Sequence, residues 1–228
     1  PEMSDPKMRE AISLITNLGD IAIAMKPEML GLMSILGVNL SLKYGNTIVS
    51  PISYVMWGVI SNLAFHDYLS GYALGQLSLK LNREKFPSDL IFAKLYAFYG
   101  WNINHFKHHT KEDMEIAIKG YGIAMANNDL VYSMYFIVML LKVSFNIGLS
   151  LDEVIEYGRK VQLFVDRYKT IFATLIGNST MMTALALQGK TDNPLSLNCA
   201  GYNEEEYLKE FSNYGQSTVY FYLRKFQL

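Results

Sequence analysis

The sequence predicts an all-α fold of stacked helical hairpins, an α-α superhelix. Three observations predict it. Apolar residues recur with helical spacing along the chain, and no convincing alternating strand pattern interrupts them. Proline, capping residues and glycine divide the chain into segments of helical length. Related segments return about 40 residues apart, which is typical of a repeated structural unit.

Proline marks the first turn of the first three predicted helices, at Pro6, Pro27 and Pro51. Ser50 precedes Pro51 as a predicted N-cap, and Gly45-Asn46 ends the second helix. The third helix runs to about residue 65. The helices predicted after it cover residues 69–84, 88–105, 110–127, 129–147, 150–168, 170–188, 203–213 and 216–228.

Polar residues are placed to cap four of these later helices. The candidates are Ser88 or Asp89, Thr110, Asn128 and Ser150. Thr110 with Asp113 resembles a capping box, and Ser150 with Glu153 resembles one more closely. Residues 189–202 contain glycine, asparagine and proline and are predicted to form the one long loop.

The repeat is visible as a recurring helix start. Ser88-Asp89-Leu90-Ile91 returns as Asn128-Asp129-Leu130-Val131, offset by 40, and Ser50-Pro51 and Lys169-Thr170 lie at similar offsets on either side. Each unit is a very apolar helix followed by a more amphipathic one, the pattern of stacked hairpins. The period exceeds that of a standard tetratricopeptide repeat, so we predict a tetratricopeptide-like solenoid with a period of about 40.

Composition limits the classes of function. The chain has 228 residues, 20 Lys and Arg, 21 Asp and Glu, and a net charge of −1, without the basic surplus of nucleic-acid binders. The single cysteine, Cys199, excludes an intrachain disulfide framework and favours a reducing, cytoplasmic location. We expect one helical-repeat domain over residues 1–228, excised from a longer multidomain protein.

Two uncharged stretches raise the question of membrane insertion. Residues 44–66 contain no charged side chain, but Gly45, Asn46 and Pro51 leave too few helical positions to span a bilayer. Residues 130–141 are uncharged and very apolar, and Lys142 ends that stretch. Both are predicted as helices buried on most sides, with no membrane insertion.

Catalytic signatures are missing from the sequence. It has no phosphate-binding loop, kinase motif, nucleophile elbow or zinc-protease motif. His105, His108 and His109 form the sharpest cluster, which we interpret as helix-terminal histidines rather than a metal site. Cys199 lies far in sequence from every histidine, so a nucleophile is not expected. We predict no catalytic residues, no metal and no cofactor for this segment.

A polar stripe is the candidate binding site. Asn62, Asn102 and Lys142 are 40 residues apart, at one equivalent place in three strongly apolar helices. A polar side chain in such a helix needs a partner, water or a groove. The three residues therefore form either an internal ladder of hydrogen bonds between hairpins or a binding stripe on a concave face.

Five segments carry a resemblance to a known family. They are Lys26-Pro27 before Leu30, residues 39–46, Gly71-Tyr72 with residues 75–81, His105-Phe106-Lys107, and residues 222–228. Over residues 26–228 the chain resembles the helical repeat region of large bacterial multidomain sensor proteins. In that family a serine/threonine-kinase-like domain and a STAND-type ATPase precede a tetratricopeptide-like region, and GAF and histidine-kinase domains often follow. The resemblance implies that this chain is part of the repeat region of such a protein. The kinase and ATP-binding motifs of the family lie outside this segment, so the resemblance assigns them to no residue here.

The expected function is that of a non-catalytic regulatory or sensor module of a bacterial signalling protein. Its expected partner is a protein, a peptide or a neighbouring domain of its own chain, because solenoid grooves commonly bind peptides. Two alternatives remain open at this point. One is an all-α enzyme with an unrecognised site, and the other is a structural spacer between ATPase and output domains.

Overall fold

The computed structural model describes residues 1–26, 28–168, 170–199, 201–213 and 215–228. Helices account for 76% of the residues, and the described ranges contain two isolated β-bridges but no strand. Neighbouring helices pack in sequence order, so the predicted all-α, helical-repeat fold class is confirmed.

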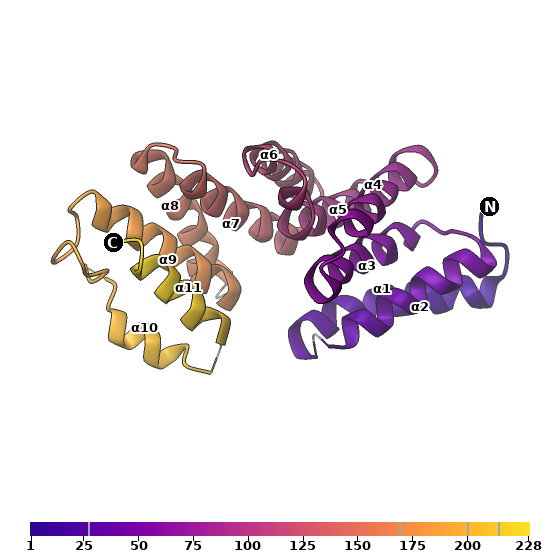
Figure 1. Cartoon of the computed structure of the whole chain (residues 1–228), viewed down its shortest axis with the longest axis horizontal. Helices are drawn as coiled ribbons and strands as arrows, with labels where there is room; N and C mark the ends of the chain where they lie inside the picture. The colour runs from indigo at the N-terminus through magenta and orange to yellow at the C-terminus, as the bar shows by residue number, and fades with distance from the viewer. Residues whose placement is uncertain (27, 169, 200, 214) are drawn as a thin grey trace. The chain divides into compact units, whose positions relative to one another are not determined.

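Figure 1 shows the helices. The helices of residues 1–132 are α1 (Pro6–Met25), α2 (Met29–Tyr44), α3 (Ser50–Phe65), α4 (Tyr68–Glu84), α5 (Asp89–Asn102), the short 3-10 helix η1 (Asn104–Phe106) and α6 (Lys111–Ala126).

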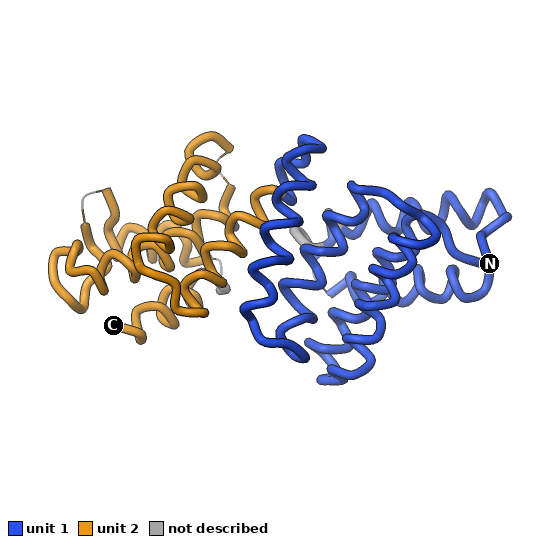
Figure 2. Tube along the Cα trace, turned by 90° about the horizontal axis from the view of Figure 1, so that it is seen from above, with its two compact units in different colours: residues 1–132 blue, residues 133–228 orange. Residues whose placement is uncertain are grey.

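The chain divides into two compact units, Pro1–Tyr132 (unit 1) and Ser133–Leu228 (unit 2), as Figure 2 shows. The remaining helices are α7 (Leu130–Asn146), α8 (Leu151–Tyr168), α9 (Ile171–Leu187), α10 (Glu204–Glu210) and α11 (Gly215–Lys225). Helix α7 begins at the end of unit 1 and continues into unit 2. The expectation of a single domain over residues 1–228 stays a prediction.

Helix starts match the capping signals in part. Ser88 Oγ accepts a hydrogen bond from the Ile91 N–H, and Ser150 forms a complete capping box with Glu153. Ser50 is different: it is the first residue of α3, and its Oγ accepts from the Thr47 N–H at 2.8 Å instead of capping its own helix. Pro27 and Lys169, which mark two predicted helix starts, lie outside the described residues.

Thr110 is the N-cap residue of α6, as predicted, but its side chain makes no capping hydrogen bond. The predicted cap at Asn128 is wrong. Asn128 takes a left-handed backbone conformation (φ 54°), and the side chain of Asp129 accepts the hydrogen bond from the Tyr132 N–H. The physical reason is that a residue in this conformation ends the preceding turn, so the next residue becomes the one positioned to cap α7.

The core of unit 1 confirms the repeat register. Val55 and Leu95, and Val59 and Tyr99, are 40 residues apart and belong to one buried cluster formed by α3, α5 and the residue after α5. Burial on both sides explains why α3 is uncharged. No helix among the described residues is long and apolar enough to cross a membrane.

Helices α3 and α4 cross at two glycines. A Cβ on Gly71 would lie 1.8 Å from Asn62 Oδ1 and 2.8 Å from the carbonyl oxygen of Gly58. A Cβ on Gly58 would in turn lie 2.8 Å from the carbonyl oxygen of Gly71. The two backbones therefore touch, which only residues without a side chain permit.

Unit 2 has a separate core. Helix α9 packs against α8 and α11, and its Leu175 and Met182 join Leu197, Tyr207 and Phe221 in one buried cluster. The Tyr207 hydroxyl donates to the Leu175 carbonyl at 2.9 Å. The predicted long loop follows α9, and Leu197 fixes it by burying its side chain in this core.

Candidate functional site: a groove between α4 and α6

The structure brings two residues of the predicted stripe together. Asn62 on α3 is 1% exposed, and its Nδ2 donates to the backbone carbonyl of Asn102 at 2.9 Å. Asn102 ends α5, and its own amide donates to the Phe98 carbonyl at 3.2 Å. This geometry is that of the internal ladder. A role for Asn62 and Asn102 in ligand binding stays a prediction.

Lys142, the third stripe residue, lies on α7 in unit 2 and is half-buried. Its neighbours Leu141 and Val143 are buried, so the aliphatic part of Lys142 lies in a largely apolar stretch of helix. Its predicted binding role likewise stays a prediction.

The three histidines of the sequence cluster have different surroundings. His108 shares a 3.0 Å hydrogen bond between its Nε2 and the Tyr72 hydroxyl, and its Nδ1 lies 3.2 Å from Glu112 Oε2. His109 Nδ1 accepts from the backbone N–H of Lys111, while His105 is exposed in η1. The described part of the chain holds no group of three or more His, Cys, Asp or Glu side chains that could hold a metal ion.

Cys199 lies in the long loop and is half-buried, with its Sγ 3.5 Å from Met182 Sδ. Burial raises the pKa of the Cys199 thiol, and the carboxylate of Asp192 adds to this effect. A raised pKa favours the thiol over the thiolate, which is the nucleophilic form.

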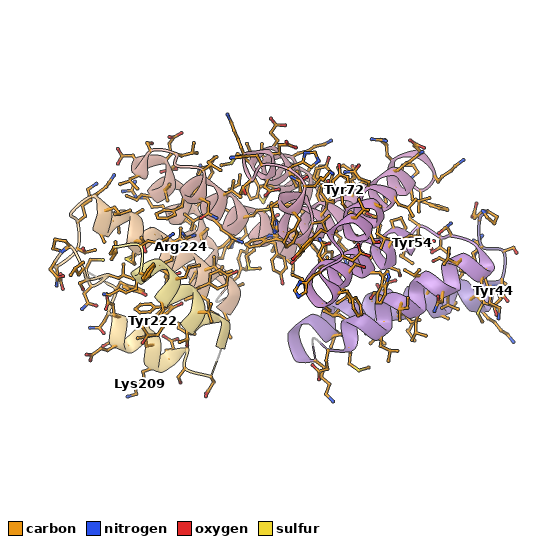
Figure 3. All side chains as sticks on the ribbon, viewed as in Figure 1. Tyr44, Tyr54, Tyr72, Lys209, Tyr222 and Arg224 are labelled. Carbon is orange, nitrogen blue, oxygen red and sulfur yellow. The ribbon has the colours of Figure 1, made fainter. Side chains whose placement is uncertain are left out.

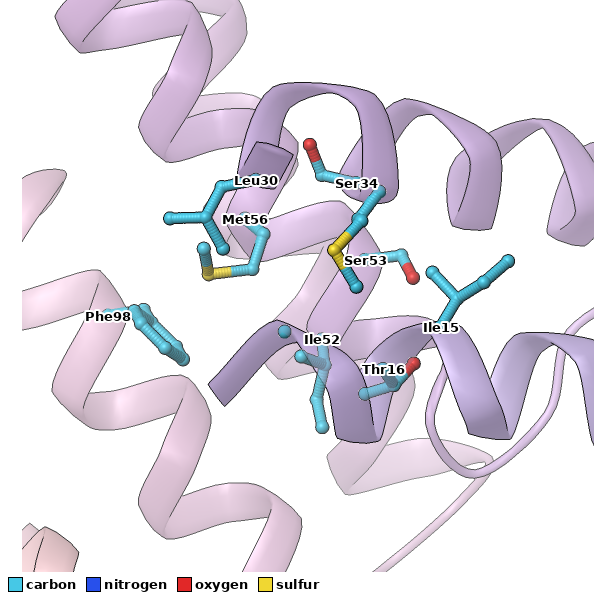
Figure 4. Close-up of a pocket in the computed structure, with 10 residues that line it drawn as sticks. Ile15, Thr16, Leu30, Ser34, Ile52, Ser53, Met56 and Phe98 are labelled. Atoms are coloured by element: carbon cyan, nitrogen blue, oxygen red, sulfur yellow. The ribbon is translucent and has the colours of Figure 1, made fainter. Parts of the chain in front are cut away.

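Among the described residues of unit 1, two hollows of different size can be compared. The first lies among α1, α2 and α3, with Thr16, Ser34 and Ser53 on its walls and Phe98 at one side (Figure 4). Its volume is about 30 Å³, which holds one or two water molecules at most. It is too small for a ligand.

The second hollow is a groove of about 580 Å³, within the range of ligand sites. We call it the α4–α6 groove. Figure 1 shows α5 between α4 and α6, and both helices pack on α5. The residues that define it are Gln76, Lys80 and Arg83 of α4, Phe92 and Tyr96 of α5, and Lys119 of α6.

The charge of the groove is positive. Three of its lining residues, Lys80, Arg83 and Lys119, are cations, and no carboxylate lines it among the described residues. Arg83 lies 3.4 Å from its neighbour Glu84 in an exposed pair, which contributes little in water. Because the whole chain has a net charge of −1, this is a local concentration of positive charge.

Aromatic rings hold one of the cations in place. Lys119 Nζ lies 5.1 Å from the centre of the Phe92 ring and 5.4 Å from that of Tyr96. It also lies 3.5 Å from the Tyr96 hydroxyl. Cation–π attraction therefore keeps the ammonium of Lys119 over the floor of the groove.

A hydrogen bond joins the α4 wall to the floor. Gln76 Nε2 donates to the hydroxyl of Tyr99 at 2.7 Å, and Tyr99 is 4% exposed. Burial raises the pKa of Tyr99 well above its ordinary value, so the hydroxyl remains protonated across the physiological range. The bond orients Gln76 along the groove.

The two walls are tied at one end. Tyr72, labelled in Figure 3, precedes Gln76 by one turn on α4 and contacts His108, which in turn contacts Glu112 in the first turn of α6. The spacing between α4 and α6 is thus set by side chains at this end. The groove combines fixed walls, positive charge and an aromatic floor, a combination that is suited to binding.

Sequence reasoning missed most of this site. It did not single out the aromatic residues Phe92 and Tyr96 as part of a site, nor the cations Lys80, Arg83 and Lys119. A partial signal was present, because Gln76, Lys80 and Arg83 have the spacing of a single face of a helix. Only the packing of α4 and α6 on α5 brings that face opposite Lys119.

Comparisons with known proteins find no match. No family model matches the chain, and no curated protein or solved structure does so.

Proposed function

We propose that this chain is a non-catalytic regulatory or sensor module of helical-repeat type, which binds a protein or peptide segment in the α4–α6 groove. The groove is the observation that carries the proposal. Its volume of about 580 Å³ accommodates several side chains of a partner, and its walls are helices rather than loops.

The same groove favours a binding module over a structural spacer. A spacer needs only enough buried contact between hairpins to stay rigid. Here Lys80 and Lys119 converge on a hollow, and Phe92 and Tyr96 remain half-buried on its floor. Half-exposed aromatic rings beside cations are typical of recognition surfaces.

The biological setting that we propose is signalling. The resemblance to the repeat region of bacterial multidomain sensor proteins supports it, and the segment bound would then belong to a partner protein or to a neighbouring domain of the same chain. We place the module in the cytoplasm, in keeping with its single cysteine. No catalytic step is assigned to it, since the sequence offers no loop to hold a nucleoside phosphate.

The test is a selection of peptides on the purified protein. A phage-displayed library of random dodecapeptides would be selected on the natural chain, and the binders then measured against two variants. Ala73→Trp places an indole in the groove, whereas Ala64→Trp is a matched change at an exposed alanine near the end of α3, away from it. We expect binding to survive Ala64→Trp and to be lost in Ala73→Trp, with the helical circular dichroism of both unchanged.

Two results would overturn the proposal. One is a selection that yields no binder. The other is a set of binders whose affinity is the same for Ala73→Trp as for the natural chain, because the bound surface would then lie elsewhere.

A further inference from the structure

We propose that the segment bound in the α4–α6 groove is acidic: an extended peptide of a partner protein, with carboxylate side chains on both sides of an apolar or aromatic one. This inference rests on the proposed function and specifies the chemistry of its partner. Charge complementarity carries it.

The cations approach the groove from both walls. Lys80 and Arg83 lie three residues apart on α4, and Lys119 lies on α6. In the described part of the chain neither Lys80 nor Lys119 forms an ion pair. A peptide lying along the groove would therefore meet an unneutralised ammonium on each side, and a carboxylate is the side-chain group that binds it best.

The floor specifies the second part of the partner. Phe92 and Tyr96, with ring centres 4.2 Å apart, form a half-buried aromatic surface, and Leu77 and Ile116 add apolar area beside it. An apolar side chain that packs beside Lys119 on the part of these rings left exposed would remove that surface from water. It would also strengthen the interaction of Lys119 with a neighbouring carboxylate by excluding solvent.

The arrangement of the groove side chains lowers the conformational entropy that is lost when a peptide binds. Lys119 lies over the rings and Gln76 is hydrogen-bonded to Tyr99 before any ligand binds, so part of the ordering of these two side chains is already in place. Pre-organised groups lose less freedom when they bind. Three cations on a short groove suit a few carboxylates, whereas nucleic-acid binders usually carry a surplus of basic residues and this chain has a net charge of −1.

The experiment uses the same peptide selection and then a defined probe. The sequences of the selected peptides are expected to be enriched in Asp and Glu around an apolar residue. The tightest binder, labelled with fluorescein, would be titrated by fluorescence anisotropy against the natural chain and the double variant Lys80→Glu/Lys119→Glu. We expect Kd to rise by about tenfold or more in the double variant, and binding to weaken as NaCl is increased.

Two controls separate this effect from general changes. Lys107→Glu reverses a charge at an exposed lysine outside the groove, and it should change Kd by less than about twofold, because exposed charges at a distance are screened. A version of the probe with Lys in place of its acidic residues should bind the double variant better than it binds the natural chain. The milder pair Lys80→Gln/Lys119→Gln should give a smaller loss than the double reversal.

Each contrary result has a distinct meaning. Selected peptides that are neutral or basic, and that Ala73→Trp still blocks, would overturn the acidic partner and leave the proposed function standing. No selected peptide at all would overturn both. A single-stranded oligonucleotide probe that binds more tightly than the peptide and competes with it, or self-association that Lys80→Glu/Lys119→Glu abolishes, would also overturn the acidic peptide as occupant.

Discussion

The side-chain amide of Asn62 donates a 2.9 Å hydrogen bond to the backbone carbonyl of Asn102, 40 residues further along the chain. Asn102 is the last residue of α5, where backbone carbonyls have no partner within the helix. A side chain from one repeat thus satisfies the helix end of the next. The bond explains why an amide is buried in a helix that is otherwise apolar.

Replacing Asn62 with leucine should destabilise the protein by about 1 kcal/mol, because the Asn102 carbonyl loses its donor. The cost is at the low end for a buried hydrogen bond, since leucine also removes Asn62 Oδ1, a buried oxygen with no hydrogen-bond partner among the described residues. Urea denaturation would measure the change. Asn39→Leu, at an exposed asparagine of α2, is the control and should change stability by less than about 0.5 kcal/mol. Equal losses in the two variants would contradict the proposed role of the bond.

Two glycine-to-alanine changes should have opposite signs. Gly71→Ala forces a Cβ against Asn62 Oδ1 and the Gly58 carbonyl, and we expect a loss of about 2–3 kcal/mol. Gly122→Ala, in the interior of α6, meets no atom within 4 Å and should stabilise the protein by about 0.5–1 kcal/mol through helix propensity. Thermal melts followed by circular dichroism separate the two. A neutral Gly71→Ala would show that α3 and α4 do not touch there.

The capping box of α8 offers a third prediction. Ser150→Ala removes the Oγ that accepts from the Glu153 N–H, and it should cost about 1 kcal/mol. Thr110→Ala is the comparison, because Thr110 also precedes a helix but makes no side-chain capping bond. It should be close to neutral in the same denaturation experiment. A loss at Thr110 as large as that at Ser150 would count against this difference.

The reactivity of Cys199 should have a shifted pH dependence. Burial favours the uncharged thiol, so the pKa of Cys199 lies above that of a free cysteine, and the thiolate forms only at higher pH. The rate of alkylation by iodoacetamide in the folded chain should therefore reach half its maximum at a higher pH than in the urea-unfolded chain. Because this is the single cysteine of the sequence, mass spectrometry reports the reaction without ambiguity. Coincident pH profiles would refute the effect of burial.

The sequence predicted the helices well, because their boundaries depend on local signals. The helix predicted from Pro51 to about residue 65 and the one predicted over residues 150–168 match α3 (Ser50–Phe65) and α8 (Leu151–Tyr168) closely. The 40-residue register was also accessible, since equivalent positions must match chemically where helices pack, as Asn62 and Asn102 do. The sequence could not show that Asn128 fails to cap α7, because the positive φ of Asn128 depends on how the preceding turn closes.

The α4–α6 groove could not be predicted from the sequence, for a different reason. Exposed faces of α4 and α6 carry no packing constraint, so Lys80 and Lys119 look like ordinary solvated lysines in the sequence. They form a site only because α4 and α6 lie at a certain spacing over α5. The contact between Tyr72 and His108, which are 36 residues apart, helps to set that spacing. Periodicity in a sequence indicates which residues of a helix are buried. It does not indicate which exposed faces of different helices lie opposite each other in the fold.

The contact of Gly58 with Gly71 has a mechanical consequence. Where side chains separate two helices, a change of rotamer lets one helix slide along the other. Here the carbonyl of each glycine lies against the backbone of the other helix, so we expect α3 and α4 to move together as one rigid unit. We then expect a displacement of α4 to reach α3 and, through Asn62, the end of α5, the helix that forms the floor of the groove.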